Sequence, residues 1–421
     1  MKFLPTNITL QEAQIIQALD KIKPYIDRLR NVVNDSNYES EESSINLPFD
    51  ATTVKKINEL KERLVTKELK YVVNIGIGGA SLASKAIYDA LYGHYDILQP
   101  KRFPKMIFLD TNNTRFIYLL IKLLEAEISS PAQVIINIVS TSGTTVETVT
   151  NSEVVLGKFP NLKERMVITT HQESPLAKAA AEQKLNVLLV PTKLGDRYSA
   201  FSPIGLFPLA CVGVDILKLL EGAVEARSAG FNGNYIQNPP LYSALILYSY
   251  LQSGKTTNVN FFFQPCLETL GKWYNMLMSE SLGKGGKGMT PIVSVGSVDL
   301  HSMNQLYVDG LKDKIFTFVN AMPTERVDIP TQLPIPSPAK LAGKNTGEIM
   351  GAIYLGTKNS YVKAGLPFFE VLFDSVSEKS LGEYMQYKMI EIMYLAKLMD
   401  VNAFDQPSVE SYKKETRLIL N

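Results

Sequence analysis

The chain is poor in cysteine, histidine and tryptophan, and it carries almost no net charge. Its 421 residues include two cysteines, three histidines and one tryptophan, with 43 basic residues against 42 acidic ones. Two cysteines far apart in sequence exclude a disulfide framework and a Cys-x-x-Cys metal pair. Scattered histidines offer no metal cluster, and the balanced charge disfavours a polyanion partner. We therefore expect no metal, no cofactor and no nucleic-acid partner.

Long apolar runs are also missing. The longest uninterrupted one, residues 203–214, is far shorter than a membrane span, and the first residues lack the continuous apolar core of a signal peptide. Cys211 and Cys266 each lie in an apolar stretch, which is typical of buried thiols in a reducing compartment. The sequence predicts a cytoplasmic protein without a membrane partner.

Two series of short apolar runs, rich in β-branched residues in the first and in aromatic residues in the second, predict the fold. They lie at residues 71–75, 105–109, 134–139, 166–169 and 187–190, and then at 259–263, 292–295 and 315–319. Helical patterns separate most of these runs, as in parallel sheets that are buried on both faces. We predict an α/β protein with two doubly wound, three-layer αβα units of the flavodoxin-like kind. Candidate boundaries are the polar run 34–46 and the turn-rich stretch 231–240.

The first glycine-rich turn is Gly76-Ile77-Gly78-Gly79, directly after a predicted strand and at the start of a helix. Glycines allow close backbone approach, and a helix start offers unpaired N–H groups to an anion. Ser81 stands where a dinucleotide fingerprint has its third glycine, which disfavours a dinucleotide-dependent oxidoreductase. A tight structural turn and a ligand contact remain equally open for this motif. A later stretch, residues 283–288, lacks the Gly-Lys-Ser/Thr ending of a nucleotide loop and follows a helix, so a nucleotide loop is excluded there.

A hydroxyl-rich segment follows the predicted strand 134–139. Its residues are Ser140, Thr141, Ser142, Gly143, Thr144 and Thr145. Short hydroxyl donors and exposed amides at a helix start suit a phosphate monoester. The alternative is an ordinary N-cap with Glu147 as its capping partner. Because one cap needs one hydroxyl, the five hydroxyls favour an anion site.

Four single residues are weak signals when each is taken alone. His301 follows a predicted buried strand, where α/β proteins place functional groups, yet a lone histidine is more often structural. Glu280, Arg197 and Lys413 are charged residues of the kind that usually lie on a solvated surface.

Six ordered segments together resemble the phosphoglucose isomerase family. They are NIGIGGASL at 74–82, STSGTTVET at 140–148, GDRYSAFSPIGL at 195–206, SESLGKGGKG at 279–288, VDLHSMNQ at 298–305 and FDQPSVESYKK at 404–414. The resemblance implies two sugar-isomerase (SIS) αβα domains. The smaller would span 46–195, and the larger would combine 1–45 with 196–421. It also implies interconversion of glucose 6-phosphate and fructose 6-phosphate through a cis-enediolate.

The resemblance assigns roles to individual residues. Glu280 matches the proton-transfer base and Arg197 the guanidinium that stabilises the enediolate, while His301 and Lys413 match the ring-opening pair. The loop 140–145 matches the phosphate site, and Gly79 matches a sugar-contacting turn. Ala80, Glu147 and Met276 complete the substrate-contacting set. The family also implies a homodimer with the active site at the subunit interface, where the histidine reaches across from the partner subunit.

The sequence departs from the family pattern at four positions near this site. Ala80 stands where serine is common, Thr141 where lysine is common, Asp196 where a second glycine is usual, and Met276 where glutamine is usual. Asp196 either neutralises the adjacent arginine or points to solvent. These departures leave two alternatives open: an isomerase with shifted hexose-phosphate specificity, such as for mannose 6-phosphate, or a non-catalytic sugar-phosphate-binding regulator.

Overall fold

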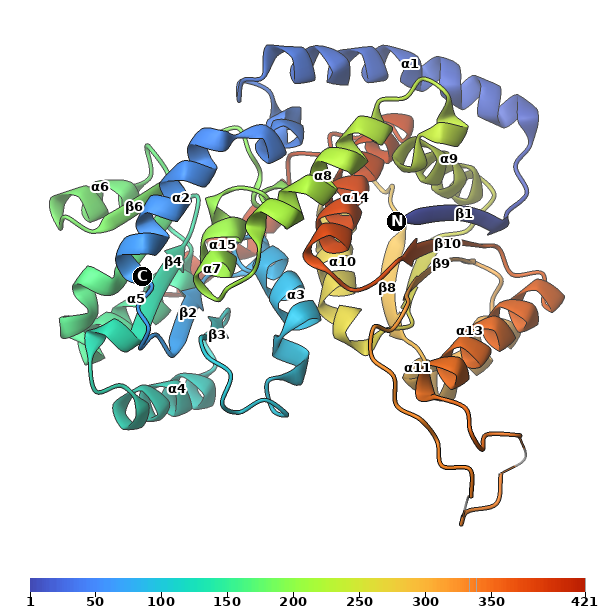
Figure 1. Cartoon of the computed structure of the whole chain (residues 1–421). Coiled ribbons are helices and arrows are strands. Elements are labelled where there is room, and N and C mark those ends of the chain that lie inside the picture. Colours follow the sequence, from blue (N-terminus) through green and yellow to red (C-terminus); the bar gives the residue numbers. More distant parts are fainter. Residues whose placement is uncertain (333, 338, 421) are drawn as a thin grey trace.

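The computed structural model describes residues 1–332, 334–337 and 339–420, which form two sheets that lie side by side (Figure 1). The first sheet has the order β3-β2-β4-β5-β6, and all of its neighbouring strands are parallel. The second has the order β1-β10-β9-β7-β8, and only β1 runs antiparallel to its neighbour. The predicted α/β fold with mostly parallel sheets is confirmed.

The strands of the first sheet are β2 (Tyr71–Ile75), β3 (Lys105–Leu109), β4 (Val134–Val139), β5 (Met166–His171) and β6 (Asn186–Val190). Those of the second are β1 (Lys2–Asn7), β7 (Thr257–Phe262), β8 (Thr290–Val295), β9 (Lys314–Ala321) and β10 (Phe368–Phe373). The helices are α1 (Glu12–Asp35), α2 (Ala51–Leu64), α3 (Leu82–Leu91), α4 (Thr114–Glu127), α5 (Val146–Lys158), α6 (Pro175–Glu182), α7 (Pro203–Cys211), α8 (Ile216–Gly230), α9 (Pro239–Gln252), α10 (Glu268–Leu282), α11 (Val298–Ser302), α12 (Asn304–Asp309), α13 (Thr346–Lys363), α14 (Glu378–Leu398) and α15 (Val409–Leu420).

Each sheet is the middle of three layers. In β2 every residue is buried: Val72 packs towards α2, α3 and α7, whereas Val73 packs towards α4, α5 and α6. The second sheet repeats this arrangement, with α10 and α14 on one face and α12 and α13 on the other. Side chains alternate between the faces of a strand, so a strand buried on both faces is mostly apolar, and the buried Asn74 of β2 accepts a hydrogen bond from Asn137 of β4 (2.6 Å). This apolar character explains why the sequence predicted these strands.

One continuous apolar core joins the two sheets. It includes Val72 from the first sheet and Phe262 and Phe369 from the second, with the fully buried Trp273 of α10. Helix α14 lies at its centre and is buried along almost its whole length. Two sheets agree with two αβα units, but the limits 46–195 and 1–45 with 196–421 stay a prediction, since the core runs through both.

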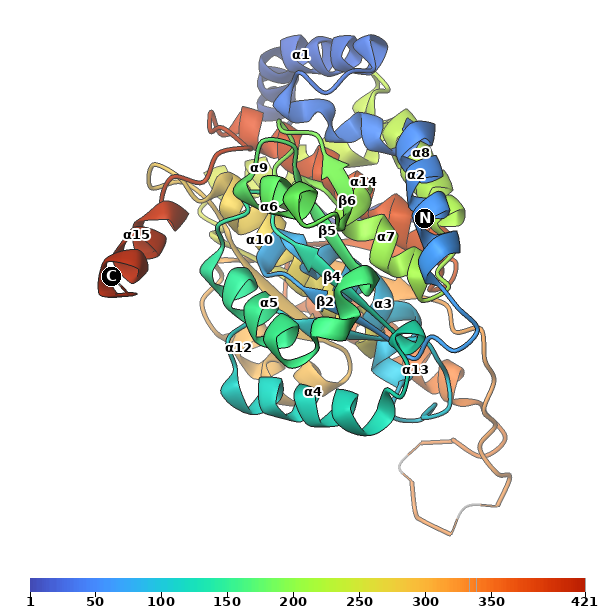
Figure 2. The same cartoon turned by 90° about the vertical axis from the view of Figure 1, so that its left-hand side faces the viewer.

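Three parts of the chain differ from expectation. Strands β1 and β10 were not predicted. The second half of the polar run 34–46 is no linker, because residues 41–49 form a mostly buried 3-10 helix in which Glu42 pairs with Arg28 at 2.8 Å. Helix α15 lies apart from the main body (Figure 2), and none of its described residues is buried. Among the described helices, none is both long and apolar enough to cross a membrane.

Candidate active site

Arg197 and Glu280 meet at the junction of the two halves of the chain. Arg197 lies in the short 3-10 turn Asp196–Tyr198 after β6, and Glu280 lies in the last turn of α10. The Nη1 atom of Arg197 is 3.5 Å from Oε2 of Glu280. The side chain of Arg197 is only 2% exposed, whereas that of Glu280 is 31% exposed. The carboxylate therefore faces solvent with a buried guanidinium behind it.

The guanidinium of Arg197 is held by four further hydrogen bonds. Nε donates to the hydroxyl of Ser281 (3.0 Å), and Nη1 donates to the side-chain oxygen of Gln406 (3.1 Å). Nη2 donates to the backbone carbonyls of Ala403 (2.7 Å) and Asp405 (3.0 Å). Neutral acceptors orient the cation without neutralising it, so its charge remains available to an anion beside Glu280.

Gly79 makes room for the turn that carries Arg197. A Cβ atom on Gly79 would lie 2.5 Å from the backbone carbon of Asp196 and 2.7 Å from the nitrogen of Arg197. Only glycine permits this approach, so the glycine-rich turn has a structural role. The neighbouring Ala80 is 3% exposed and packs with Val139 and Ile204. Its side chain belongs to the core, which leaves only its backbone for a ligand.

The surroundings of Glu280 shift its titration. Burial raises the pKa of the Glu280 carboxyl above its ordinary value, against the charge of Arg197, which lowers it. Asp196 raises that pKa further, while Lys413 and Lys284 lower it. A carboxylate with a raised pKa is a stronger base, which suits a group that removes a proton from carbon near neutral pH.

Asp196 takes neither of the two orientations expected for it. It makes no hydrogen bond or ion pair with the Arg197 guanidinium within the described ranges, and it is only half-buried on its turn. Burial raises the pKa of its carboxyl, while hydrogen bonding by Thr141 and the charges of His171 and Arg197 lower it. The carboxyl thus acts on Arg197 through its charge without bonding to it, and it lies between the arginine turn and the hydroxyl-rich loop.

The hydroxyl-rich loop between β4 and α5 divides its side chains between structure and surface. The Ser140 hydroxyl accepts a hydrogen bond from the backbone amide of Gly143 (3.1 Å). It also lies 3.1 Å from the hydroxyl of Thr145. Gly143 has φ +68, and a Cβ there would lie 2.9 Å from the nitrogen of Leu176. Thr145 is the N-cap residue of α5 but makes no capping hydrogen bond. The capping-box alternative is therefore wrong, and the open face of the loop remains free for an anion.

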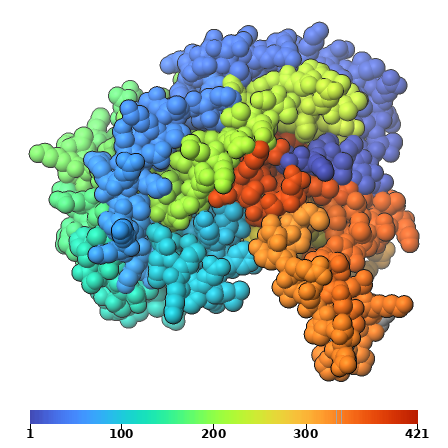
Figure 3. Space-filling view, in the orientation of Figure 1, coloured from blue at the N-terminus to red at the C-terminus, as the bar shows by residue number. Residues whose placement is uncertain are grey.

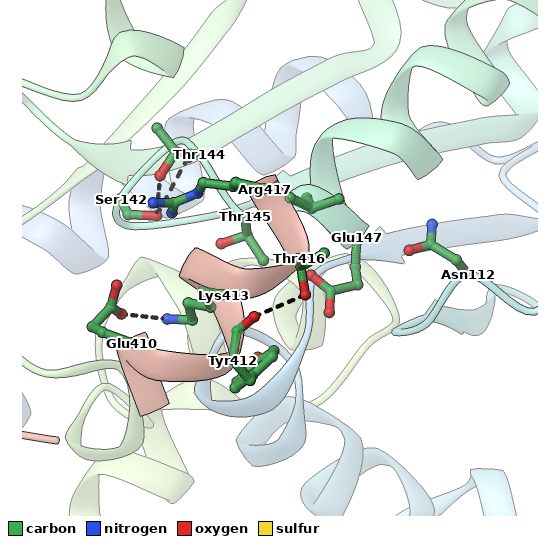
Figure 4. A pocket seen from close by; sticks show the side chains of 11 residues that line it. Asn112, Ser142, Thr144, Thr145, Glu147, Glu410, Tyr412, Lys413, Thr416 and Arg417 are labelled. Carbon is green, nitrogen blue, oxygen red and sulfur yellow. Dashed lines mark hydrogen bonds and ion pairs between the residues drawn. The ribbon is translucent and has the colours of Figure 1, made fainter. Parts of the chain in front are cut away.

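A cavity of about 170 Å³ separates this loop from α15 (Figure 4). The loop side contributes Ser142, Thr144 and Thr145 together with Val146 and Glu147, and Asn112 also lines it. The helix side contributes Glu410, Tyr412, Lys413, Thr416 and Arg417. The charge of Lys413 acts on both Glu280 and Asp196, so this lysine connects the cavity to the carboxylate–guanidinium pair.

One predicted site residue lies apart from this group. The side chain of His301 is exposed on the short helix α11, and no hydrogen bond or ion pair joins it to another described residue. Met276 is half-buried on α10, packs against the main core and lies one turn before Glu280 on the same helix face. The chain by itself brings Glu280 and Arg197 into contact and places Lys413 on the wall of the neighbouring cavity, but it does not bring His301 to them. Within the described ranges, no group of histidine, cysteine and carboxylate side chains could hold a metal ion.

Sequence reasoning missed the residues that hold Arg197 in place and a second cation in the cavity. Ser281 was detectable, because it follows Glu280 directly, but the carbonyls of Ala403 and Asp405 carry no sequence signal. Lys284 reaches the Asn402 carbonyl and pairs with Asp405 at 2.6 Å, so the glycine-rich stretch 283–288 positions this segment. Arg417 was detectable only by its spacing of four residues from Lys413.

The fold and the site define an α/β sugar-phosphate isomerase. A family model described as phosphoglucose isomerase matches residues 55–300, more than half of the chain. A glucose-6-phosphate isomerase from Methanocaldococcus jannaschii is 31% identical over 346 residues, which cover 82% of this chain and 82% of that protein. The chain belongs to the phosphoglucose isomerase family.

Solved structures agree with this assignment. A hypothetical protein from Thermus thermophilus matches with a TM-score of 0.87 and 28% identity, covering 100% of this chain and 99% of that one. A glucose-6-phosphate isomerase from Chlamydia trachomatis shares the fold with a TM-score of 0.74 and 20% identity, over 87% of this chain and 73% of that one. The family and the fold predicted from the sequence are therefore confirmed.

Proposed function

We propose that this chain interconverts glucose 6-phosphate and fructose 6-phosphate, the step shared by glycolysis and gluconeogenesis. The observation that carries the proposal is the contact of Glu280 with Arg197, 3.5 Å apart, beside a loop suited to phosphate. Moving a proton between C2 and C1 of the open-chain sugar needs a base beside both carbons and a cation beside the developing oxyanion. This pair offers both.

Glu280 is the base in this proposal. It takes the proton from C2 of the aldose, forming a cis-enediolate, and returns it to C1; the proton of the C2 hydroxyl moves to O1 in the same interconversion, which gives the ketose. Burial raises the pKa of its carboxyl, which strengthens it as a base and readies its protonated form to return the proton. Arg197 faces the enediolate oxygens with a guanidinium fixed in advance by Ser281 and the carbonyls of Ala403 and Asp405. A donor that is already oriented need not reorganise as charge develops.

Lys413 and His301 form the ring-opening pair in this proposal, and the pair requires two subunits. Lys413 reaches the site from α15 of the same chain, whereas His301 is exposed and lies apart from the Glu280–Arg197 pair. We propose a homodimer in which His301 of each subunit completes the other subunit's site. Exposed apolar side chains near His301 support this, among them Val298 (65%) and Leu311 (76%). So do the described residues of the segment between β9 and α13, which project from the body (Figure 3) and expose Met322 and Val327.

The loop 140–145 holds the 6-phosphate of the substrate in this proposal. Its exposed hydroxyls and the first amides of α5 are neutral donors of the kind that bind phosphate oxygens. A cytoplasmic location is consistent with the two free cysteines, both of which are buried.

The direct test is a coupled assay that converts fructose 6-phosphate to glucose 6-phosphate. We expect turnover by the wild type and a fall of about a hundred- to ten-thousand-fold in kcat for Glu280→Gln, because the amide cannot accept the proton. Glu268→Gln is the matched control: it removes an exposed carboxylate from the first turn of the same helix and leaves turnover unchanged. Equal rates for Glu280→Gln and Glu268→Gln would contradict the assigned base.

The same assay distinguishes this function from an isomerase of shifted specificity and from a non-catalytic regulator. Mannose 6-phosphate is tested in parallel, and a higher kcat/KM for it would indicate shifted specificity. Tight binding of hexose phosphates with no turnover of any of them would indicate a regulator.

The shared site is tested by mixing two inactive variants. Glu280→Gln and His301→Asn are co-expressed, and half of the mixed dimers' sites then carry both native residues. Random pairing restores about a quarter of wild-type activity if the histidine comes from the partner subunit. Activity no greater than that of the separate variants would contradict a shared site.

A further inference from the structure

The hydroxyl-rich loop 140–145 has no positive charge to balance the negative charge of a phosphate group. A phosphate monoester carries about −1.5 to −2 charge near neutral pH. The segment 140–145 contains no cationic side chain. Its hydroxyls also have partners of their own: that of Ser140 lies 3.1 Å from that of Thr145, that of Thr144 donates to Ser142 (3.3 Å), and Thr141 faces Asp196. Neutral donors alone leave most of the phosphate charge uncompensated, so the cation must come from another element.

Helix α15 presents two cations to the cavity. Lys413 and Arg417 are four residues apart, so they lie on the same face of the helix, and both line the cavity opposite the loop. Lys413 is paired with Glu410 at 2.8 Å, and its charge acts on Glu280. Arg417 makes no hydrogen bond or ion pair with any residue that the structure describes. Its guanidinium is therefore the cation that remains for a ligand.

The orientation of Arg417 fits this role. Figure 4 shows its guanidinium directed towards Ser142 and Thr144, whereas Glu147 lies on the other side of the cavity, near Thr416. The other carboxylate that lines the cavity, Glu410, is paired with Lys413, and neither carboxylate is paired with Arg417 within the described ranges. A guanidinium offers N–H groups in a planar fork that matches two phosphate oxygens, which a lysine ammonium cannot do.

We propose that Arg417 binds the phosphate group of the substrate, opposite the hydroxyls of Ser142, Thr144 and Thr145. This inference rests on the proposed function for the identity of the ligand, a sugar phosphate. It divides α15 between two tasks: Lys413 acts on the reacting end of the sugar, and Arg417 holds its phosphate end. Arg417 thereby makes the enzyme select phosphorylated sugars over neutral ones.

The charges that act on Glu280 support this division. The charges with the largest effect on its pKa are those of Arg197, Asp196, Lys413 and Lys284, and Arg417 is not among them. Loss of Arg417 is therefore expected to weaken binding without changing the proton-transfer step or its pH dependence. No described residue of α15 is buried, so the substitution does not disturb the core.

The test compares Arg417→Gln with Lys414→Gln. Hydrogen bonds to a charged group contribute about 1.5–3 kcal/mol, so KM for fructose 6-phosphate is expected to rise about 10- to 100-fold in Arg417→Gln, with kcat within about threefold. Competitive inhibition by inorganic phosphate weakens by a similar factor, and Arg417→Lys recovers part of the loss. Lys414→Gln removes a positive charge from the same helix, but Lys414 does not line the cavity. KM for fructose 6-phosphate and inhibition by inorganic phosphate are therefore expected to stay unchanged in this variant.

Two results would overturn the inference. One is a KM for Arg417→Gln within twofold of that for Lys414→Gln. The other is a fall in kcat with unchanged inhibition by inorganic phosphate. Failure of the proposed function is a separate result, in which the wild type converts no hexose 6-phosphate. Calorimetric titration with inorganic phosphate then tests the phosphate site without any turnover. Loss of phosphate binding in Arg417→Gln supports the site, and equal binding in Arg417→Gln and Lys414→Gln contradicts it.

Discussion

The two halves of the candidate site are built in opposite ways. In the first, Arg197 is almost fully buried, holds Glu280 at 3.5 Å and donates to Ser281, Gln406 and two backbone carbonyls. In the second, an exposed loop faces α15, a helix without a buried residue among those described. The chemical half is therefore fixed before substrate binds, whereas the binding half is open.

This difference has a physical reason. Stabilising a developing oxyanion requires donors that are already in place, because reorganisation during the reaction costs free energy. A phosphate group, in contrast, is charged throughout the reaction and can draw flexible donors to itself. We therefore expect substitutions in the first half to change kcat and stability together, and those in the second half to change KM alone.

Replacing Arg197 is the strongest test of this contrast. Arg197→Lys keeps the charge but cannot make the same set of hydrogen bonds, so kcat is expected to fall about a hundredfold or more. The buried carbonyl of Ala403 and the partly buried carbonyl of Asp405 lose a donor, which lowers the free energy of unfolding by about 1–3 kcal/mol. Steady-state kinetics and denaturant unfolding measure the two effects, with the exposed Arg115→Lys as control. A variant with normal kcat would show that the buried half is not preorganised for catalysis.

Replacing Thr145 tests the open half. Thr145→Ala removes one hydroxyl from the cavity wall, and KM for fructose 6-phosphate is expected to rise several-fold, by about the value of one hydrogen bond to a charged group. The melting temperature and kcat stay close to wild type because the loop hydroxyl is not part of the core. Thr150→Ala, an exposed threonine on the same helix, is the control. An unchanged KM would place the phosphate elsewhere.

Replacing Asp196, which lies between the two halves of the site, is expected to give the smallest effect, a shift in the pH dependence of kcat/KM. A base works only when deprotonated, so kcat/KM falls as pH drops through the pKa of Glu280, which burial raises. The charge of Asp196 raises that pKa further, so Asp196→Asn is expected to lower it and to move the acid limb of kcat/KM to lower pH. A shift to higher pH would contradict the electrostatic contact between the two carboxyls.

Sequence reasoning found the strands that are mostly apolar and lie in a βα series, and it missed β1 and β10. Strand β1 contains Pro5, alternates between exposed and half-buried residues, and is paired only with a strand more than 360 residues away. Strand β10 contains the buried carboxylate Glu370, which Lys358 neutralises at 2.8 Å and to which Tyr354 donates. No local pattern predicts such long-range compensation.

The site divides in the same way. Glu280, Arg197 and Lys413 were predicted by family resemblance; Glu280 and Arg197 lie in contact, and Lys413 lines the neighbouring cavity. Arg417 was not, because an arginine on a terminal helix has no distinguishing pattern until that helix lies opposite the loop. Asp196 was expected to face either the guanidinium or solvent, and its contact with Thr141 depends on a packing of two distant turns that sequence does not show.

The most direct test of the central claim is exchange of the sugar proton with solvent. Fructose 6-phosphate is incubated with the protein in D2O, and incorporation of deuterium at C1 is followed by NMR. The wild type is expected to incorporate deuterium during isomerisation, and Glu280→Gln is expected to incorporate none while still binding the substrate. Incorporation by Glu280→Gln at the wild-type rate would contradict the assignment of Glu280 as the base.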